Sequence, residues 1–412
     1  MKRKDIGVVV LSGFIGAGKT SVLNNLLRHR GDRRMAVILS DVGGAGIDSE
    51  VFDGSDAHLF RNGEALIELG NACAGYTLRT HLINVVSRLA HDGRYDTIII
   101  ELSGVTDPVF VTNAFDLPDE EGRILSTIAR LDHIVTVVDA FRFWQDYESG
   151  ENLFERGMGR GVDDQRALSE LLADQVECGT VIVLNKVDLA AEQDSRRLEG
   201  LLQHLNPDAT VLQAVGGNIT FDQLERSLSS QSSATAGEPG WMKLLRGQLV
   251  PSREVTGVQA FVYRARRPFH PDRFWTLMQE EWAGVLRSKG YFWGASQSKA
   301  CYMWSQAGGS CLYERLGRWW VGIHDQHWPS DPVALNEIRE VWDLEYGDWR
   351  IELAIVGEDM DSADLSRRLD ACLLTSAELL LDEDRWEAFI DPFKKPSWEK
   401  RQARGSRGNS SD

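Results

Sequence analysis

The sequence contains few cysteines and no long hydrophobic run. The cysteines are odd in number and widely spaced, so a disulfide framework is not the source of its stability. Near the basic N-terminus, the apolar segment 8–11 is too short for the core of a signal peptide, and no segment approaches the about 20 apolar residues of a membrane span. We therefore expect a cytoplasmic protein that does not associate with membranes. The five cysteines are Cys73, Cys178, Cys301, Cys311 and Cys372.

The sequence also has fewer positively charged than negatively charged side chains. The chain has 45 Lys and Arg residues against 62 Asp and Glu residues, which gives a net charge of −17. Such a surface repels a phosphate backbone, which argues against general nucleic-acid binding. The composition, 42% hydrophobic and 26% charged over 412 residues, is typical of a globular protein with two or three domains.

Short β-branched runs alternate with amphipathic helical stretches from residue 7 to about residue 220. The runs lack polar alternation, as do strands that are buried on both faces. Between the first two runs, Val22, Leu23, Leu26 and Leu27 fall on one helical face. The pattern predicts an α/β fold with a doubly wound, mostly parallel sheet. The predicted strands are residues 7–13, 36–40, 97–102, 133–140, 180–188 and 210–214.

The composition changes sharply after the first half of the chain. Residues 228–240 are rich in Ser, Ala and Gly, as flexible linkers are, and twelve of the 13 tryptophans follow them. We therefore predict an α/β domain at 1–227, a linker at 228–254, a smaller α+β domain at 255–393 and a basic, disordered tail at 394–412.

The second domain is expected to contain one sheet with helices packed on it. Its tryptophans are expected to form the core, because large aromatic side chains usually serve burial, and a groove for a client protein is the alternative. The predicted strands are residues 257–265, 291–296, 301–309, 318–323 and 349–357, and the predicted helices are residues 273–282 and 362–374.

Residues 13–20 match the phosphate-binding P-loop, Gly-x-x-x-x-Gly-Lys-Thr, and lie between a predicted strand and a predicted helix. Glycines allow the backbone N–H groups of such a loop to surround a phosphate, and the helix N-terminus adds positive potential. Lys19 is expected to reach the terminal phosphates as a catalytic group, and Thr20 to bind Mg²⁺. The alternative is a glycine-rich turn with a surface lysine. The predicted nucleotide-binding residues are Gly13, Gly16, Ala17, Gly18, Lys19, Thr20 and Ser21.

A second motif follows an apolar strand, at the edge where a doubly wound sheet binds its ligand. It is Asn185-Lys186-Val187-Asp188. Asp188 can accept two hydrogen bonds from the N1–H and amino groups of guanine, a pair of donors that adenine lacks, so the motif favours GTP over ATP. By itself the motif could be a loop with a capping aspartate. Together with the P-loop, it predicts that Asn185, Lys186 and Asp188 contribute to guanine binding.

Two further carboxylates follow predicted strands. Glu101 is expected to contact Mg²⁺ directly or through water, unless it is only an exposed acid at a strand end, and Gly104 can offer its N–H to the γ-phosphate. Asp41 precedes a glycine-rich loop at 43–46 that permits large backbone rearrangement. We expect Asp41 and this loop to form a nucleotide-dependent switch, with Asp41 and Glu101 acting as catalytic groups and Mg²⁺ ligands.

These motifs resemble the CobW-like metallochaperone GTPases, including their zinc-homeostasis and nitrile-hydratase-activator branches. The first half carries the resemblance in GFIGAGKTSVLNNLL, ELSGVTDP, TVVDA and NKVD. The second half carries it in RPFHPDRFW, GVLRSKGYFWGAS, WSQAGG, GRWW and DPF. The resemblance implies a P-loop α/β domain followed by a smaller domain of β-sheet and helices. It also implies slow GTP hydrolysis coupled to the delivery of a metal, usually zinc, to a client protein.

The sequence departs from the family pattern at the metal site. The resemblance implies a Gly-Cys-x-Cys-Cys segment that supplies thiolates, but in the aligned residues 71–79 only Cys73 remains. A lone thiolate cannot make a closed tetrahedral zinc site, so zinc stays an open question at this point. Cys73 either contributes one ligand together with Asp41 or His81, or is a packed small hydrophobe. His324 and His327 have a metal-like spacing, but their segment is typical of a surface loop.

Two functions are consistent with these motifs. In the first, the chain is a GTPase metallochaperone that serves a client metalloprotein, and its nucleotide state changes its affinity for the metal. In the second, it is a GTP-dependent regulatory or assembly factor that no longer carries metal. No glutamine follows Gly104 and no arginine finger is evident, so we expect slow hydrolysis that a partner can accelerate.

Overall fold

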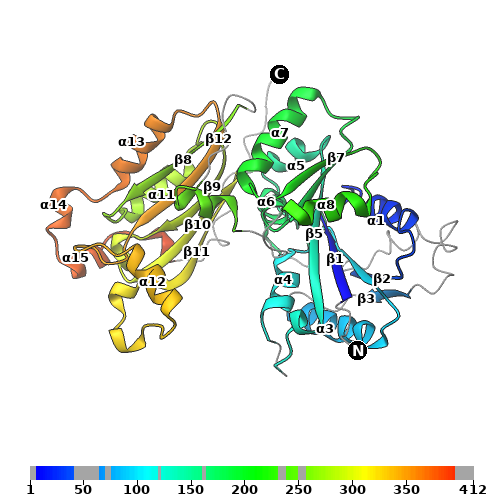
Figure 1. The fold of residues 1–412 in the computed structure, drawn as a ribbon. Coiled ribbons are helices and arrows are strands. Elements are labelled where there is room, and N and C mark those ends of the chain that lie inside the picture. The colour runs from blue at the N-terminus through cyan, green and yellow to red at the C-terminus, as the bar shows by residue number, and fades with distance from the viewer. Residues whose placement is uncertain are drawn as a thin grey trace, which may run out of the picture. The chain divides into compact units, whose positions relative to one another are not determined.

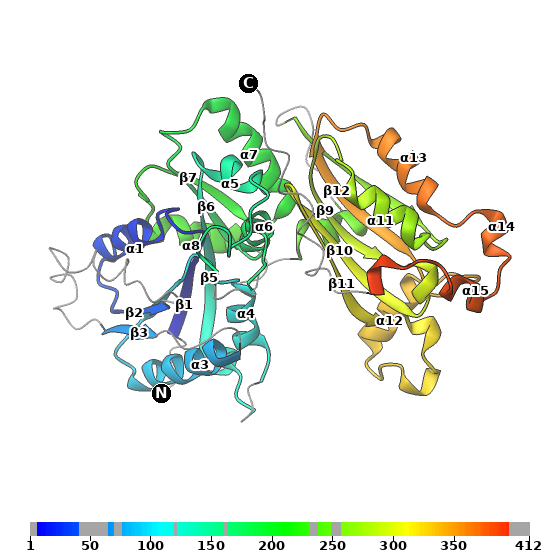
Figure 2. The ribbon, with the colours of Figure 1, turned by 180° about the vertical axis from the view of Figure 1, so that it is seen from behind.

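The first half of the chain folds around a seven-stranded sheet in which all neighbouring strands are parallel (Figures 1 and 2). The strand order is β3-β2-β4-β1-β5-β6-β7, so the chain fills one side of β1 first and then the other. In such sheets ligands bind beyond the carboxyl ends of the strands where the order changes direction. The strands are β1 (Ile6–Ser12), β2 (Met35–Ser40), β3 (Ala65–Leu69), β4 (Thr97–Leu102), β5 (Ala129–Asp139), β6 (Val181–Asn185) and β7 (Thr210–Ala214).

This computed structural model describes most of the chain. The described residues are 6–40, 65–69, 76–118, 122–159, 164–230, 238–248 and 257–394. They divide between two compact units of the chain, Met1–Gly240 and Trp241–Asp412. The linker at 228–254 and the tail at 394–412 stay predictions. Among the described residues, no helix combines the length and the apolar character that crossing a membrane requires.

Helices cover both faces of the parallel sheet. Val9 and Leu11 of β1 pack with α1 and α8 on one face, whereas Val8 and Val10 pack with α3 and α4 on the other. This two-sided burial explains why the central strands are uninterrupted apolar runs. The helices of this unit are α1 (Lys19–Arg28), α3 (Tyr76–Asp92), α4 (Val109–Asp116), η2 (Leu125–Thr127), α5 (Phe143–Tyr147), α6 (Leu168–Glu177), α7 (Glu192–Leu205) and α8 (Phe221–Ser230).

The predicted α/β class, with a doubly wound parallel sheet, is confirmed, and two edge strands differ from the prediction. Residues 210–214 form a strand as predicted, but only Ala214 is buried, because β7 has a neighbour on one side only. At the opposite edge, the prediction omits β3. Its sequence, Ala65–Leu69, is short and interrupted by Glu68, so it gives no clear strand signal.

The second unit is built on a five-stranded antiparallel sheet with the order β11-β10-β9-β12-β8. Its strands are β8 (Val258–Ala265), β9 (Val285–Phe292), β10 (Ala300–Ala307), β11 (Ser310–Arg318) and β12 (Ile351–Glu358). The helices are α9 (Gly240–Leu245), α11 (Pro271–Gln279), η3 (Ala295–Gln297), η4 (Trp320–Gly322), η5 (Asp325–His327), α12 (Pro332–Glu340), α13 (Ser362–Cys372), α14 (Ser376–Leu379), α15 (Glu383–Glu387) and η6 (Pro392–Lys394).

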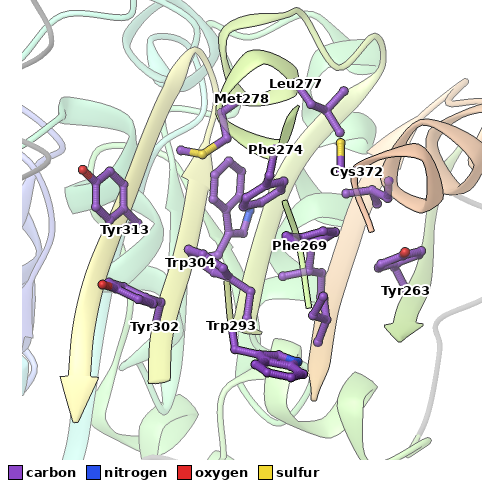
Figure 3. Close-up of a cluster of buried hydrophobic side chains, with 14 of the residues drawn as sticks. Tyr263, Phe269, Phe274, Leu277, Met278, Trp293, Tyr302, Trp304, Tyr313 and Cys372 are labelled. Atoms are coloured by element: carbon purple, nitrogen blue, oxygen red, sulfur yellow. The ribbon is translucent and has the colours of Figure 1, made fainter. Parts of the chain in front are cut away.

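Aromatic side chains fill the core between this sheet and its helices (Figure 3). The rings of Phe269 and Phe274 stack with centroids 4.1 Å apart, and those of Trp282 and Trp304 with centroids 5.3 Å apart. The prediction that the tryptophans build this core is confirmed for most of them. Trp293, Trp304 and Trp319 are buried in it, and Trp275, Trp282 and Trp349 pack against it.

Two predicted strands of the second unit differ from the structure. Of residues 291–296 only the first two belong to a strand, β9, because the carbonyl of Trp293 accepts from the N–H of Phe269 at 3.1 Å and η3 follows.

The strand predicted at 318–323 is wrong. Residues 318–323 contain a 3₁₀ turn, Trp320–Gly322, instead of a strand. The cause is Asp348, a buried carboxylate that accepts hydrogen bonds from the N–H groups of Trp320 and Val321, each at 2.8 Å. The oxygens of Asp348 thus take the place of the carbonyl acceptors that a neighbouring strand would otherwise provide. The strand lies earlier in the chain, as β11.

An ion pair beside α14 predicts how the second unit responds to acid. The Arg273 guanidinium donates two hydrogen bonds to the Glu378 carboxylate, at 2.9 and 2.8 Å, and Thr375 donates two more from its N–H and hydroxyl groups. Arg273 above all holds the pKa of Glu378 at about 2. Because the folded pKa is depressed, this stabilisation is complete above the usual glutamate pKa and is lost as the pH falls towards 2.

We expect Glu378→Gln to lower the free energy of unfolding of the second unit by about 1 kcal/mol at neutral pH, a modest figure because the pair is partly exposed to solvent. The deficit should shrink below about pH 4.5, where the Glu378 carboxyl of the unfolded wild-type chain begins to take up its proton while that of the folded chain stays ionised. Tryptophan fluorescence during urea unfolding at several pH values measures it, since most tryptophans lie in this unit. The exposed Glu383→Gln is the matched control. A deficit that stays constant down to about pH 3 would contradict the assignment.

Candidate nucleotide-binding site

The predicted P-loop follows β1 and has the backbone that the motif requires. Gly13 and Gly18 have φ angles of 129° and 104°, a region that favours glycine. A Cβ atom on Gly13 would collide with the carbonyl of Val137, and one on Gly18 with the side chain of Asn185. Directly after the loop, α1 begins at Lys19, and the first N–H groups of a helix have no partner within it. Loop and helix start together therefore form an anion-binding site.

Lys19 lies inside this loop. Its side chain is only 7% exposed, and its ammonium group donates to the carbonyls of Gly13 at 2.9 Å and Phe14 at 3.2 Å. A neutral carbonyl is a weaker partner for an ammonium group than a charged phosphate oxygen. The positive charge is thus kept at the loop, where the terminal phosphates of a nucleotide are expected.

Two oxygen-bearing side chains meet beside Lys19. The Thr20 hydroxyl donates to Oε1 of Glu101 at 2.9 Å, and Glu101 is buried near the carboxyl end of β4, level with Leu11 of β1. Hydroxyl and carboxylate oxygens are the ligands that Mg²⁺ prefers, so this donor set fits the metal. The structure therefore brings together two of the three predicted Mg²⁺ ligands. The third, Asp41, lies outside the described residues.

The loop after β4 also contacts the P-loop. A Cβ atom on Gly104 would lie 2.5 Å from the backbone nitrogen of Ile15 and equally close to its Cγ1. Only glycine allows the two main chains to approach this closely. This contact is consistent with the prediction that Gly104 offers its N–H group to a γ-phosphate.

Asn185, the first residue of the second motif, ties two loops together. Its side chain is 1% exposed and donates to the carbonyl of Ala17 at 2.9 Å. Its Oδ1 accepts from the N–H of Gly217, in the loop after β7, also at 2.9 Å. Both polar groups of the amide are therefore engaged within the protein. Asn185 therefore holds the P-loop in place, and its role in guanine binding stays a prediction.

Lys186 and Asp188 occupy the same edge of the sheet. Lys186 has a φ angle of 62°, and its ammonium group donates to the carbonyl of Gly16 at 2.7 Å and to the carboxylate of Asp139 at 2.6 Å. Asp188 is exposed, two residues further on. The motif thus joins the P-loop through Lys186 and leaves the Asp188 carboxylate accessible to a base.

Family models match both units of the chain. The model described as "CobW/HypB/UreG, nucleotide-binding domain" matches residues 7–213. The model described as "Cobalamin synthesis protein cobW C-terminal domain" matches residues 258–373. The chain belongs to the CobW family. The resemblance found in the sequence is thereby confirmed, and so is the predicted enzyme class, a GTPase with GTP as its nucleotide.

Individual relatives extend the match. The chain is 36% identical over 399 residues to the Zinc-regulated GTPase metalloprotein activator 1 of Dictyostelium discoideum. This alignment covers 94% of this chain and 84% of that protein. It is 34% identical over 190 residues to the Zinc chaperone CobW of a Sinorhizobium species, covering 45% and 51% of the two chains. For the Zinc chaperone CobW of Pseudomonas aeruginosa the identity is 30% over 227 residues, covering 53% and 58%.

The metal residues that the sequence suggested for this CobW-family chain are not brought together in the described part of the structure. Cys73, like Asp41, lies outside the described residues. His81 is exposed on α3, and His324 and His327 are exposed as expected for a surface loop. Within the described ranges, no group of three or more His, Cys, Asp or Glu side chains could hold a metal ion. The assignment of Cys73 as a zinc ligand stays a prediction.

Asp139, which lies at the same edge of the sheet and pairs with Lys186, was not among the residues predicted from the sequence. Asp139 ends β5, and its carboxylate contacts Lys186 while it accepts hydrogen bonds from the N–H groups of Phe141 and Arg142 at 3.0 and 3.1 Å. It therefore fixes both the lysine of the second motif and the start of the next helical segment. The signal was present in the sequence, because an acid also ends this buried strand, as Glu101 does near the end of β4.

Proposed function

We propose that the chain is a GTP-dependent zinc chaperone that delivers the metal to a client metalloprotein in the cytoplasm. The observation that carries the proposal is the similarity, over 94% of the chain, to a protein named as a zinc-regulated GTPase metalloprotein activator. The arrangement of Lys19, Thr20 and Glu101 around the P-loop supports the GTPase part. The cytoplasmic location rests on the scattered cysteines of the sequence.

Hydrolysis at this site needs positioning and charge neutralisation rather than covalent chemistry. A water oxygen bonds to the γ-phosphorus as the bond to the β–γ bridging oxygen breaks. The electron pair leaves with GDP, and a proton of the water passes to an oxygen of the released phosphate. Lys19 moves its ammonium group from the Gly13 and Phe14 carbonyls to the phosphate oxygens, and Gly104 donates its N–H to the γ-phosphate. Bound Mg²⁺, held by Thr20 and Glu101, supplies further positive charge beside the phosphates.

The predicted metal residues follow strands at the same edge as the nucleotide site. Asp41 directly follows β2, and Cys73 comes four residues after β3. Both strands are parallel to β1, so their carboxyl ends lie at the edge where the P-loop lies. Their positions in the chain, shortly after strands that end at this edge, support a coupling between the nucleotide and a metal bound by Asp41 and Cys73. Linkage then requires that GTP and zinc change each other's affinity by the same factor.

Zinc binding in the two nucleotide states tests this function. The purified chain is titrated with zinc against a competing fluorescent chelator, with GTP and Mg²⁺ and again with GDP and Mg²⁺. We expect one zinc ion per chain with micromolar or tighter affinity, an affinity that differs between GTP and GDP, and a loss of at least about tenfold in Cys73→Ala.

Cys301→Ala is the matched control for the zinc titration. Burial raises the pKa of the Cys301 thiol to about 12, so we expect this thiol to stay protonated and its removal to leave zinc affinity unchanged. Equal zinc affinity in the wild type and in Cys73→Ala would contradict the role of Cys73. GTP hydrolysis without any zinc binding would instead favour the second candidate, a GTP-dependent regulatory or assembly factor. That candidate is favoured by the two cysteines that the segment 71–79 has lost relative to the family pattern.

A further inference from the structure

We propose that Gln175, on α6, is a positioning residue for GTP hydrolysis. It holds the loop 103–107, which follows β4, against the P-loop, so that Gly104 keeps its place beside the γ-phosphate. The inference rests on the proposed nucleotide site and adds to it a residue on a helix that carries none of the nucleotide motifs.

The first observation is the pair of hydrogen bonds that the Gln175 side chain makes. Its amide nitrogen donates to the carbonyl of Gly104 at 3.0 Å and to the carbonyl of Thr106 at 3.3 Å. The side chain is 1% exposed, so water does not compete for these bonds. The loop itself turns tightly, with the N–H of Thr106 bonded to the carbonyl of Ser103 at 3.0 Å. One buried amide therefore holds two carbonyls of the turn that contains Gly104.

The second observation is that Gln175 is itself fixed. The Thr136 hydroxyl donates to the main-chain carbonyl of Gln175 at 2.7 Å, in a buried position. Thr136 belongs to β5 and is paired with Ser12, the last residue of β1 before the P-loop. Gln175 thus spans from the strand beside the P-loop to the loop that carries Gly104. The bond from Thr136 fixes the main chain from which the Gln175 side chain reaches the loop.

A third side chain holds the same loop. Arg166 donates to the carbonyl of Val105 at 3.0 Å, and its guanidinium is oriented by two hydrogen bonds to Asp164, at 2.8 and 2.9 Å. Three consecutive carbonyls of the loop are therefore held by side chains from the segment 164–175. Glycine has the most mobile main chain of all residues, so Gly104 depends on such external contacts to hold one conformation.

These contacts hold the loop at the place where bound GTP and bound GDP differ. Gly104 lies against Ile15 of the P-loop, and its N–H group is proposed to meet the γ-phosphate, which GDP lacks. A loosened loop should therefore weaken binding of a GTP analogue and slow hydrolysis, while the affinity for GDP stays unchanged. A residue that only stabilised the fold would change the affinities for both nucleotides alike.

The test compares Gln175→Met with the wild-type chain. We expect kcat for GTP hydrolysis to fall at least about tenfold and the affinity for a non-hydrolysable GTP analogue to fall about tenfold, while GDP affinity stays within about twofold. Single-turnover hydrolysis and fluorescent-nucleotide titrations measure these quantities. If Gln175→Met does not fold, Gln175→Asn keeps a polar amide in the buried site but shortens its reach towards the Gly104 and Thr106 carbonyls by one methylene. The same split between GTP and GDP is expected of it.

Asn206→Leu is the matched control, because Asn206 is also a buried amide that donates to main-chain carbonyls of α6 and the residues after it. It bonds to Val176, Glu177 and Gly179, at 2.8, 3.2 and 2.6 Å, away from the loop that carries Gly104. The Asn206→Leu variant should have a lower thermal stability than the wild type. Its kcat and its preference for the GTP analogue should be those of the wild type. A Gln175→Met variant with wild-type kcat, or with equal losses for both nucleotides, would overturn the inference. A wild-type chain that binds no GTP would instead overturn the proposed function.

Discussion

Lys19→Ala is expected to reduce GTP hydrolysis by about a thousandfold, equivalent to about 4 kcal/mol of transition-state stabilisation. The reason is that the variant loses the ammonium charge kept at the P-loop, bonded to the carbonyls of Gly13 and Phe14. Charge builds up on the phosphate oxygens as the terminal bond breaks, so the loss should be larger in kcat than in nucleotide affinity. Phosphate release at saturating GTP and Mg²⁺ measures the effect.

Lys299→Ala is the control for this substitution. Lys299 is exposed in the second unit, and its removal should leave phosphate release unchanged. The circular dichroism spectrum of Lys19→Ala should match that of the wild type, because the fold of the P-loop rests mainly on its glycines and on Asn185. A folded Lys19→Ala variant that hydrolyses GTP within about threefold of the wild-type rate would refute the catalytic assignment.

Asp188→Asn is expected to exchange the base preference of the protein. The exposed carboxylate of Asp188 can accept hydrogen bonds from the N1–H and amino groups of guanine. An asparagine amide instead offers a donor to the carbonyl group that xanthine carries in place of that amino group. We expect the affinity for GTP to fall about a hundredfold and the affinity for xanthosine triphosphate to rise by a similar factor.

Competition titrations with the two nucleotides measure this exchange. Asp222→Asn removes an exposed aspartate from α8 in the same unit and should leave the preference for GTP unchanged. The exchange of preference is the informative result, because a damaged site would lose affinity for both nucleotides. Loss of GTP binding without any gain for xanthosine triphosphate would argue against contact between Asp188 and the base.

The nucleotide site could be predicted from the sequence because its parts are local in the chain. The P-loop is eight consecutive residues whose glycines are required by their positive φ angles, a property that the sequence motif records even though the close contacts of Gly13 and Gly18 are with the distant Val137 and Asn185. Glu101 was recognised because an acid near the end of a buried strand needs no tertiary contact to be seen. Its bond to Thr20 then followed from the parallel alignment of β4 with β1.

The contacts that the sequence could not predict join residues that are distant in the chain. The bond from Gln175 to Gly104 spans 71 positions, and a glutamine inside an amphipathic helix gives no sign of its partner. Asn185 was predicted to bind the nucleotide, and nothing in its sequence context announced its contact with Ala17, 168 positions away, which supports the P-loop. Residues 318–323 had the composition of a strand, and only the distant Asp348 turns them away from the sheet.

Isothermal titration calorimetry of the intact chain with GTP in the presence of Mg²⁺ tests the central claim most directly. We predict saturable heat for one GTP per chain, a much weaker signal for ATP, and loss of the difference between GTP and ATP in Asp188→Asn. No heat with GTP, or equal heats with GTP and ATP, would contradict the assignment of this edge of the sheet as a guanine nucleotide site.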